Sequence, residues 1–222
     1  MEGFQPIIDG LPLIRQGLAI TFIASIFGSV LAVVVGFTLG LATLLRQPLL
    51  RRAIRAYVYF FRGTPSLVLL FLIFFGLPMM GLTLPALQAG IVALGLQSSA
   101  YVLEVVRAAL EGVSSDQYEA AALDGAGQWT TLYRVILPQS VRQMVPGVVN
   151  ELIGLIKGTS LLSVISVGDV MRSVQLINAR HFIPFEAYGT LAIIYLVIIA
   201  VVTRCSVILE RYLDRVVFRG AD

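Results

Sequence analysis

The chain has 222 residues, of which 58% are hydrophobic and 13% charged, and its formal net charge is +3 at pH 7. Soluble domains contain about 45–50% apolar and about 25% charged residues, so this chain has too few polar side chains to cover a soluble surface. Intrinsic disorder is also excluded, because it requires low hydrophobicity and high charge. The composition therefore predicts an integral membrane protein.

The basic residues are spread between apolar runs rather than gathered into one stripe. Fifteen of the sixteen are arginine, and Lys157 is the only lysine. A nucleic-acid-binding domain concentrates its basic residues on one face, so we expect no nucleic-acid partner and instead expect contacts with the lipid bilayer. Cys205 is the only cysteine, which excludes an intramolecular disulfide and a multi-cysteine metal site.

Five charge-poor runs are long enough to cross a bilayer. An apolar helix of about 20 residues spans a hydrocarbon core of roughly 30 Å. The runs cover approximately residues 17–45, 57–78, 85–103, 145–165 and 187–209, and we expect Pro78 to stop the second helix. The sequence predicts an all-α membrane protein with five transmembrane helices in one domain, residues 1–222.

The arginines predict the orientation of these spans. Five spans place the two termini on opposite sides of the membrane. If the N-terminus is outside, the inner segments hold eleven arginines (46, 51, 52, 55, 62, 107, 134, 142, 211, 215 and 219) and the outer segments three (15, 172 and 180). Because short cytoplasmic segments carry an excess of basic residues, we expect the N-terminus outside and the C-terminus in the cytoplasm.

The longest polar segment, residues 104–142, is then a cytoplasmic loop. Asp116 is expected to act as an N-cap, with Glu119 three residues later in the positively polarised first turn of a short helix. Gly125 is expected to end this helix in a left-handed conformation. A second helical piece is expected over residues 128–136, ended by Pro138.

A motif runs through both pieces of the loop: Glu119-Ala120-Ala121, three residues, Gly125, nine residues, Val135, one residue, Leu137-Pro138. This spacing resembles the EAA motif of the membrane subunits of ABC importers, with Val135 in place of the usual isoleucine. The resemblance implies that the loop helix docks into a groove on a separate cytoplasmic ATPase subunit. Alternatively, Glu119 only caps a helix and the alanines reflect helix propensity. Trp129 is either an anchor at that interface or part of the packing within the loop.

Three further segments resemble the polar amino-acid permeases of this class, the binding-protein-dependent histidine, glutamine, arginine and cystine types. Arg62-Gly63-Thr64-Pro65 precedes an apolar run, and Ala100-Tyr101, Glu104 and Arg107 precede the loop. Lys157-Gly158-Thr159-Ser160-Leu161 matches a segment in which the family more often has an acid at the second position, so Gly158 leaves a backbone hinge there.

The resemblance implies a type I ABC importer permease fold in the bacterial inner membrane and a mechanism of alternating access. It also implies the partners: a second permease subunit, identical or paralogous, an ATPase dimer, an extracytoplasmic solute-binding protein and an amino-acid substrate. The chain has no phosphate-binding loop G-x-x-x-x-G-K-[ST] and no catalytic set of residues. We therefore expect a transporter subunit rather than an enzyme, without a metal or cofactor of its own, while ATP and Mg²⁺ bind the partner ATPase.

Polar side chains inside the spans are costly and usually face a cavity or a partner. Two groups are candidates for a substrate pathway: Gln97, Ser98, Ser99, Tyr101 and Glu104 at the third span, and Asn150, Glu151, Lys157, Thr159 and Ser160 at the fourth. A zwitterionic solute needs an acid for its ammonium group and a donor for its carboxylate. The alternative is that these residues only join helices by hydrogen bonds.

An ATP-independent channel or an ion-coupled carrier is the alternative function. Such a carrier commonly shows internal repeats with interrupted helices at matching positions, and no convincing repeat relates the halves of this chain. Within the first span, Gly36 and Gly40 form a small-xxx-small pair, which is usually a helix-packing feature. The sequence leaves the particular amino acid open.

Overall fold

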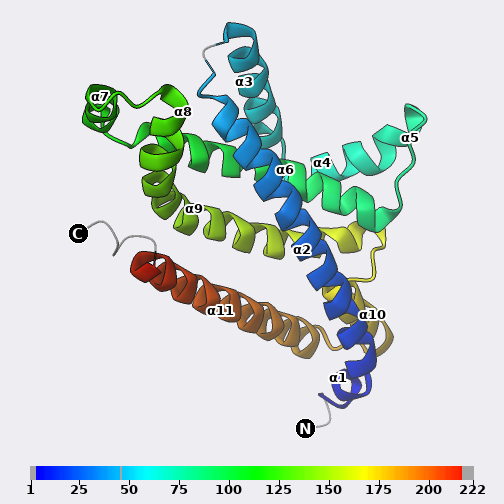
Figure 1. The fold of residues 1–222 in the computed structure, drawn as a ribbon. Coiled ribbons are helices and arrows are strands. Elements are labelled where there is room, and N and C mark those ends of the chain that lie inside the picture. The colour runs from blue at the N-terminus through cyan, green and yellow to red at the C-terminus, as the bar shows by residue number, and fades with distance from the viewer. Residues whose placement is uncertain (1–3, 46, 217–222) are drawn as a thin grey trace.

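The computed structural model describes residues 4–45 and 47–216, and this part of the chain is helical without any strand (Figure 1). In chain order the elements are α1 (Gln5–Asp9), α2 (Leu11–Ala42), α3 (Pro48–Gly63), α4 (Ser66–Phe71), η2 (Leu72–Gly76), α5 (Leu77–Met79), α6 (Ala86–Glu111), α7 (Ser115–Leu123), α8 (Gln128–Thr131), η3 (Leu132–Ile136), α9 (Leu137–Gly158), η4 (Thr159–Ile165), α10 (Val170–His181) and α11 (Pro184–Val216).

Four stretches of the described chain are long and apolar enough to cross a membrane: Leu11–Ala42, Ala86–Glu111, Trp129–Ile165 and Pro184–Arg211. They match the first, third, fourth and fifth predicted spans. The second predicted span is not one straight helix, because the chain bends by 107° between α3 and the segment Ser66–Met79. Pro65 causes the break, since a residue before proline avoids the helical region and Thr64 is extended (φ −98°, ψ 131°).

Two prolines were expected to end helices: the helix at Pro78 ends one residue later, at Met79, whereas the helix at Pro138 continues. Pro78 follows the π-helical turn η2 and lies inside α5, and Pro138 follows the π-helical turn η3 and lies in the first turn of α9. A proline clashes with the carbonyl four residues earlier, and in both cases that residue, Phe74 or Arg134, belongs to the widened turn. The π turn thus lets the helix continue past the proline.

Helix α6 lies at the centre of the fold and packs against α2, α9, α3 and α4. Its contact with α2 is close because Gly36 and Gly40 present no side chain there. A Cβ at Gly36 would lie 2.7 Å from the Ser99 carbonyl oxygen, and one at Gly40 would lie 2.5 Å from Val106 Cγ1. The packing role expected for this small-xxx-small pair is therefore confirmed.

The expected long loop is shorter in the structure. Helix α6 continues to Glu111, so Glu104 and Arg107 lie on the helix rather than in the loop, and α9 begins at Leu137. The segment between α6 and α9, residues 112–136, holds α7 and α8, and it lies on the same side as the C-terminal end of α6 and the N-terminal end of α9 (Figure 1).

A smaller core forms at the other end of the molecule, where α1 and α10 were not expected from the sequence. Ile7, Ile14, Val174 and Ile177 are buried there together with residues of α11. Asp169 caps α10: its carboxylate accepts a hydrogen bond from the Arg172 backbone N–H at 2.9 Å. This end of the molecule is opposite the α7–α8 segment (Figure 1).

Candidate functional site

The α7 helix begins two residues earlier than the sequence indicated. Ser114, not Asp116, holds the N-cap position with extended backbone angles (φ −62°, ψ 145°), and Asp116 lies within the first turn. Glu119 is consequently the fifth residue of α7 and lies beyond the first turn, so the expected capping role of Glu119 is wrong. Burial of Val113 against the main core sets the point where the chain turns into α7.

The end of α7 is as predicted. Gly125 has a left-handed conformation (φ 73°), which costs a residue with a Cβ roughly 1–2 kcal/mol. The Gly125 N–H donates to the Ala122 carbonyl at 3.1 Å, and the Ala126 N–H donates to the Ala121 carbonyl at 2.9 Å. This pair of bonds is a Schellman motif, which reverses the chain between α7 and α8.

The motif residues divide between exposed and packed positions. Ala121 is buried, and Val135 and Leu137 pack against the main core, with Pro138 half-buried beside them. Glu119, Ala120, Gly125 and Trp129 are exposed. The second half of the motif, Val135, Leu137 and Pro138, therefore joins the loop to α9. The first half is mostly exposed on the protein surface.

A largely apolar exposed surface that includes Glu119 lies on α7, α8 and η3. We call it the coupling surface and define it by Tyr118, Glu119, Leu123, Trp129 and Tyr133. Leu123 is 89% exposed, Trp129 66% and Tyr133 63%, and the rings of Trp129 and Tyr133 stack with 6.3 Å between their centroids. Exposed apolar patches of this kind commonly mark contact sites for other proteins or for membranes.

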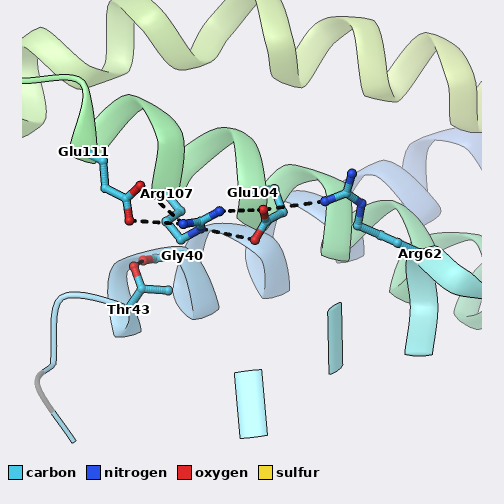
Figure 2. A network of polar contacts seen from close by, with 6 residues as sticks. All are labelled: Gly40, Thr43, Arg62, Glu104, Arg107 and Glu111. Carbon is cyan, nitrogen blue, oxygen red and sulfur yellow. Dashed lines mark hydrogen bonds and ion pairs between the residues drawn. The ribbon is translucent and has the colours of Figure 1, made fainter. Parts of the chain in front are cut away.

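A chain of ion pairs links α3 to the end of α6 (Figure 2). Arg107 Nη2 lies 2.8 Å from Glu104 Oε2, and Arg107 Nη1 lies 3.2 Å from Glu111 Oε1. Arg62 Nη1, on α3, lies 3.6 Å from Glu104 Oε2 and its guanidinium lies 4.9 Å from the centroid of the Tyr101 ring. Only Glu104 and Tyr101 were candidate pathway residues. The i, i+3, i+7 spacing of Glu104, Arg107 and Glu111 was the signal available in the sequence.

The other candidates on α6 hold the broken second span in place. Gln97 Nε2 donates to the Thr64 carbonyl at 3.2 Å, at the break itself. The Tyr57 hydroxyl donates to the Leu96 carbonyl at 3.1 Å and is hydrogen-bonded to the Ser99 hydroxyl. Thr64 is extended and lies between α3 and α4, so its carbonyl belongs to neither helical ladder, and Gln97 supplies its hydrogen-bond donor.

The candidates on the fourth span separate into two groups. Glu151 on α9 faces Ser98 on α6, and the charge of Arg62 attracts it. Asn150 is exposed on another face of α9. The structure therefore brings Glu151, Ser98 and Arg62 together, and it extends this group through Glu104 to Arg107.

The remaining candidates lie toward the end of the fourth span. Thr159 is buried in the 3-10 segment η4, where its hydroxyl donates to the Ile156 carbonyl at 2.7 Å and lies 3.5 Å from the Tyr195 hydroxyl. Ser160 donates to the Lys157 carbonyl at 2.8 Å, and the Lys157 side chain is exposed. Lys157, Thr159 and Ser160 do not join the cluster around Arg62.

The fold and these sites together define a class: a polytopic helical membrane protein with a broken span and a helical loop that is exposed on the protein surface. Residues 26–219 match the family "Binding-protein-dependent transport system inner membrane component". The chain belongs to this family and is thus an inner-membrane permease subunit of a transport system, as its resemblance to ABC permeases indicated.

Among similar proteins are three from Bacillus subtilis strain 168. The L-cystine transport system permease protein TcyB is 36% identical over 97% of this chain and 90% of its own length. The probable amino-acid ABC transporter permease protein YckA is 34% identical over 92% of this chain and 90% of its own length. The arginine transport system permease protein ArtQ is 33% identical over 95% of this chain and 96% of its own length. The amino-acid permease resemblance predicted from the sequence is confirmed by these relatives.

Solved structures show the same fold. A chain from the crystal structure of an amino acid ABC transporter with histidines superposes with a TM-score of 0.88 at 32% identity, covering 94% of this chain and 98% of that one. A chain of the inward-facing MetNI methionine ABC transporter superposes with a TM-score of 0.78 at 21% identity, covering 91% and 97%, which supports the fold alone.

Proposed function

We propose that this chain is the pore-forming subunit of an ATP-driven importer for polar amino acids. In this proposal residues 1–222 form one transmembrane domain with the N-terminus outside and the C-terminus in the cytoplasm. A second permease subunit completes the pore, an ATPase dimer binds the inner face, and a solute-binding protein delivers the amino acid from outside. ATP and Mg²⁺ act on the ATPase, and the permease alternates between inward- and outward-facing states.

The exposed coupling surface is the single observation that carries this proposal. It lies in the segment between α6 and α9, outside the stretches of α6 and α9 that pack in the main core, and it joins α9 directly through Val135 and Leu137. Movement of a partner bound to α7 would therefore be transmitted to the fourth span. The eleven arginines expected on the inner side favour a cytoplasmic position for this surface, where it would meet an ATPase rather than lipid.

The cluster of Arg62, Ser98, Glu104 and Glu151 supports a polar route for the substrate. It offers a carboxylate for an ammonium group and a guanidinium for a carboxylate, both needed by a zwitterionic amino acid. The cluster gathers at the broken second span, where α3, α6 and α9 approach one another. Transporters commonly place their sites at such discontinuous helices.

Uptake by proteoliposomes tests the proposal. The complex is purified from its source membrane and reconstituted with ATP on the side of α7, and radiolabelled amino acids are supplied with the binding protein on the other side. We expect accumulation of a polar amino acid only when ATP is present. Glu151→Gln is expected to raise the KM of uptake about tenfold, because the ammonium group loses a charged partner.

Two results would count against this account. Uptake that continues at the same rate without ATP would establish the channel or ion-coupled carrier instead. An unchanged KM and unchanged selectivity in Glu151→Gln would remove Glu151 from the substrate route while leaving the importer assignment intact.

A further inference from the structure

Helix α3 carries a row of arginines along one face. Arg51, Arg55 and Arg62 are spaced i, i+4 and i+11, which places them within about 40° of one another around the helix axis. Val58 continues the same row, and the neighbouring Ile54 is buried. Arg52 lies about 100° away from Arg51 on the same helix.

This row lines a cleft of about 650 Å³ between α3, the end of α2 and the end of α6. That volume is within the range of roughly 300–1,000 Å³ typical of ligand sites. The lining residues are Thr43, Arg51, Ile54, Arg55, Val58, Tyr59, Arg62, Glu104, Arg107 and Glu111. Four cations therefore face two carboxylates in the cleft.

The two carboxylates are already engaged. Glu104 is shared by Arg62 and Arg107, and Glu111 is paired with Arg107 (Figure 2). Among the side chains that the structure describes, neither Arg51 nor Arg55 has a carboxylate within ion-pair distance. The cleft therefore has an excess positive charge concentrated on two guanidinium groups.

We propose that this cleft binds the phosphate headgroup of an anionic phospholipid in the inner leaflet. Guanidinium groups bind phosphate oxygens by paired hydrogen bonds, and two of them on successive turns of α3 provide a charge-matched site. Basic pockets at the cytoplasmic side of membrane proteins bind such headgroups. The inner-leaflet position rests on the orientation in the proposed function.

The surroundings of the cleft suit a lipid. Tyr59, on the rim, is 77% exposed, and Phe60 and Leu49 on α3 are exposed as well. Aromatic side chains are enriched at the level of the headgroups, where their rings contact both acyl chains and polar groups. A bound lipid would thus place its phosphate on Arg51 and Arg55 and its acyl chains along exposed apolar residues of α3.

Binding of fluorescently labelled phosphatidylglycerol to the purified full-length chain in mild detergent tests the site, with labelled phosphatidylcholine as the neutral reference. The double variant Arg51→Gln/Arg55→Gln is compared with Arg52→Gln, which removes an arginine from the same helix outside the cleft. We expect the wild type and Arg52→Gln to bind phosphatidylglycerol at least about tenfold more tightly than the double variant, since each basic residue near an anionic surface contributes appreciably. The wild type and both variants should have the same affinity for phosphatidylcholine.

Three results would overturn the proposal. An equal loss of affinity for phosphatidylglycerol in Arg52→Gln and in the double variant would indicate that the lipid responds to diffuse surface charge. Displacement of the lipid by inorganic phosphate at equal concentration would indicate a soluble anion. A double variant that keeps its lipid affinity but loses a co-purifying ATPase would indicate a protein contact.

A conservative variant keeps the test decisive if the double glutamine variant does not fold. Arg51→Lys/Arg55→Lys retains both charges and loses the forked donors. A several-fold weaker affinity for phosphatidylglycerol supports the site, and an unchanged affinity contradicts it. Because the readout is lipid binding, failure here leaves the ATP dependence of transport untouched.

Discussion

Asp169 is the residue whose chemistry the fold alters most. Its side chain is 0% exposed, Oδ1 accepts the Arg172 backbone N–H, and Oδ2 has no hydrogen-bond partner. Burial raises the pKa of this carboxyl from 3.8 to about 6, against the lowering effect of the backbone hydrogen bonds and of the Arg172 charge. At neutral pH the ionised carboxylate is therefore less stable in the folded protein than in the unfolded chain.

This shift predicts a pH-dependent stability. The folded state binds the Asp169 proton more tightly than the unfolded chain, so its contribution to stability is full below about pH 4 and is lost as the pH rises through about 6. Asp169→Asn keeps an oxygen that can accept the Arg172 N–H and removes the charge. We expect the free energy of unfolding of the variant to be higher than that of the wild type by up to about 3 kcal/mol near pH 8, and to equal it near pH 4.

Thermal unfolding of the purified chain across this pH range measures the effect. Parallel profiles for the wild type and Asp169→Asn would show that Asp169 has an ordinary pKa in the folded protein. Helix α10, which Asp169 caps, lies at the opposite end of the molecule from α7 and α8 (Figure 1), so we expect the variant to leave the coupling surface unchanged.

At the scale of elements, α2 and α6 are in close contact across Gly36. A Cβ there would lie 2.7 Å from both the Ser99 carbonyl oxygen and Val102 Cβ, and the carbonyl belongs to a helix backbone that cannot move aside. Gly154 on α9 is the matched position: it is also helical, and a Cβ there would meet nothing within 4 Å.

The two glycines predict opposite effects of the same substitution. Gly36→Ala should lower the free energy of unfolding by about 1–3 kcal/mol, because overpacking forces α2 and α6 apart. Gly154→Ala should leave it unchanged or raise it by up to about 1 kcal/mol, since alanine is the better helix former. Melting temperatures in detergent compare the two. Equal melting temperatures for both variants would mean that α2 and α6 are not in close contact.

The elements also show how far the sequence predicts the fold. Apolar length was enough to locate four spans, and the left-handed Gly125 was identifiable because few residues besides glycine adopt that conformation. The continuation of α9 past Pro138 was not predictable from proline alone, because it depends on the π turn before it. The break at Pro65 was missed because the predicted span joined the apolar residues 57–61 to the apolar run after Pro65, across Arg62-Gly63-Thr64.

The polar cluster was predicted only in part, and for a different reason. Glu104, Ser98 and Glu151 stood out because charges and hydroxyls inside apolar spans are rare. Arg62 was not among the candidates for that pathway, since its partner Glu104 lies 42 positions further along the chain, and only the tertiary contact of α3 with α6 brings them together. Spacing along one helix reveals pairs such as Glu104 and Arg107, and not pairs between helices.

At the scale of the whole molecule, the account joins three parts: a bundle centred on α6, a polar cluster at the broken second span, and the coupling surface on α7, α8 and η3. The ion pairs from Arg62 to Glu111 run along α6 toward the loop that carries α7 (Figure 2). This arrangement connects the region proposed for the substrate to the region proposed for the ATPase.

Purification of this chain from its source membrane, with identification of the proteins that accompany it, tests the central claim most directly. We expect an ATPase subunit to co-purify with the wild type and to be lost with Glu119→Lys and with Gly125→Arg, which introduces a side chain at a left-handed position. Asp124→Lys is the matched control, because it makes the same charge change about 140° around α7 from Glu119 and should retain the ATPase. Recovery of the chain without any ATPase, or equal retention of the ATPase by all three variants, would contradict docking through the coupling surface.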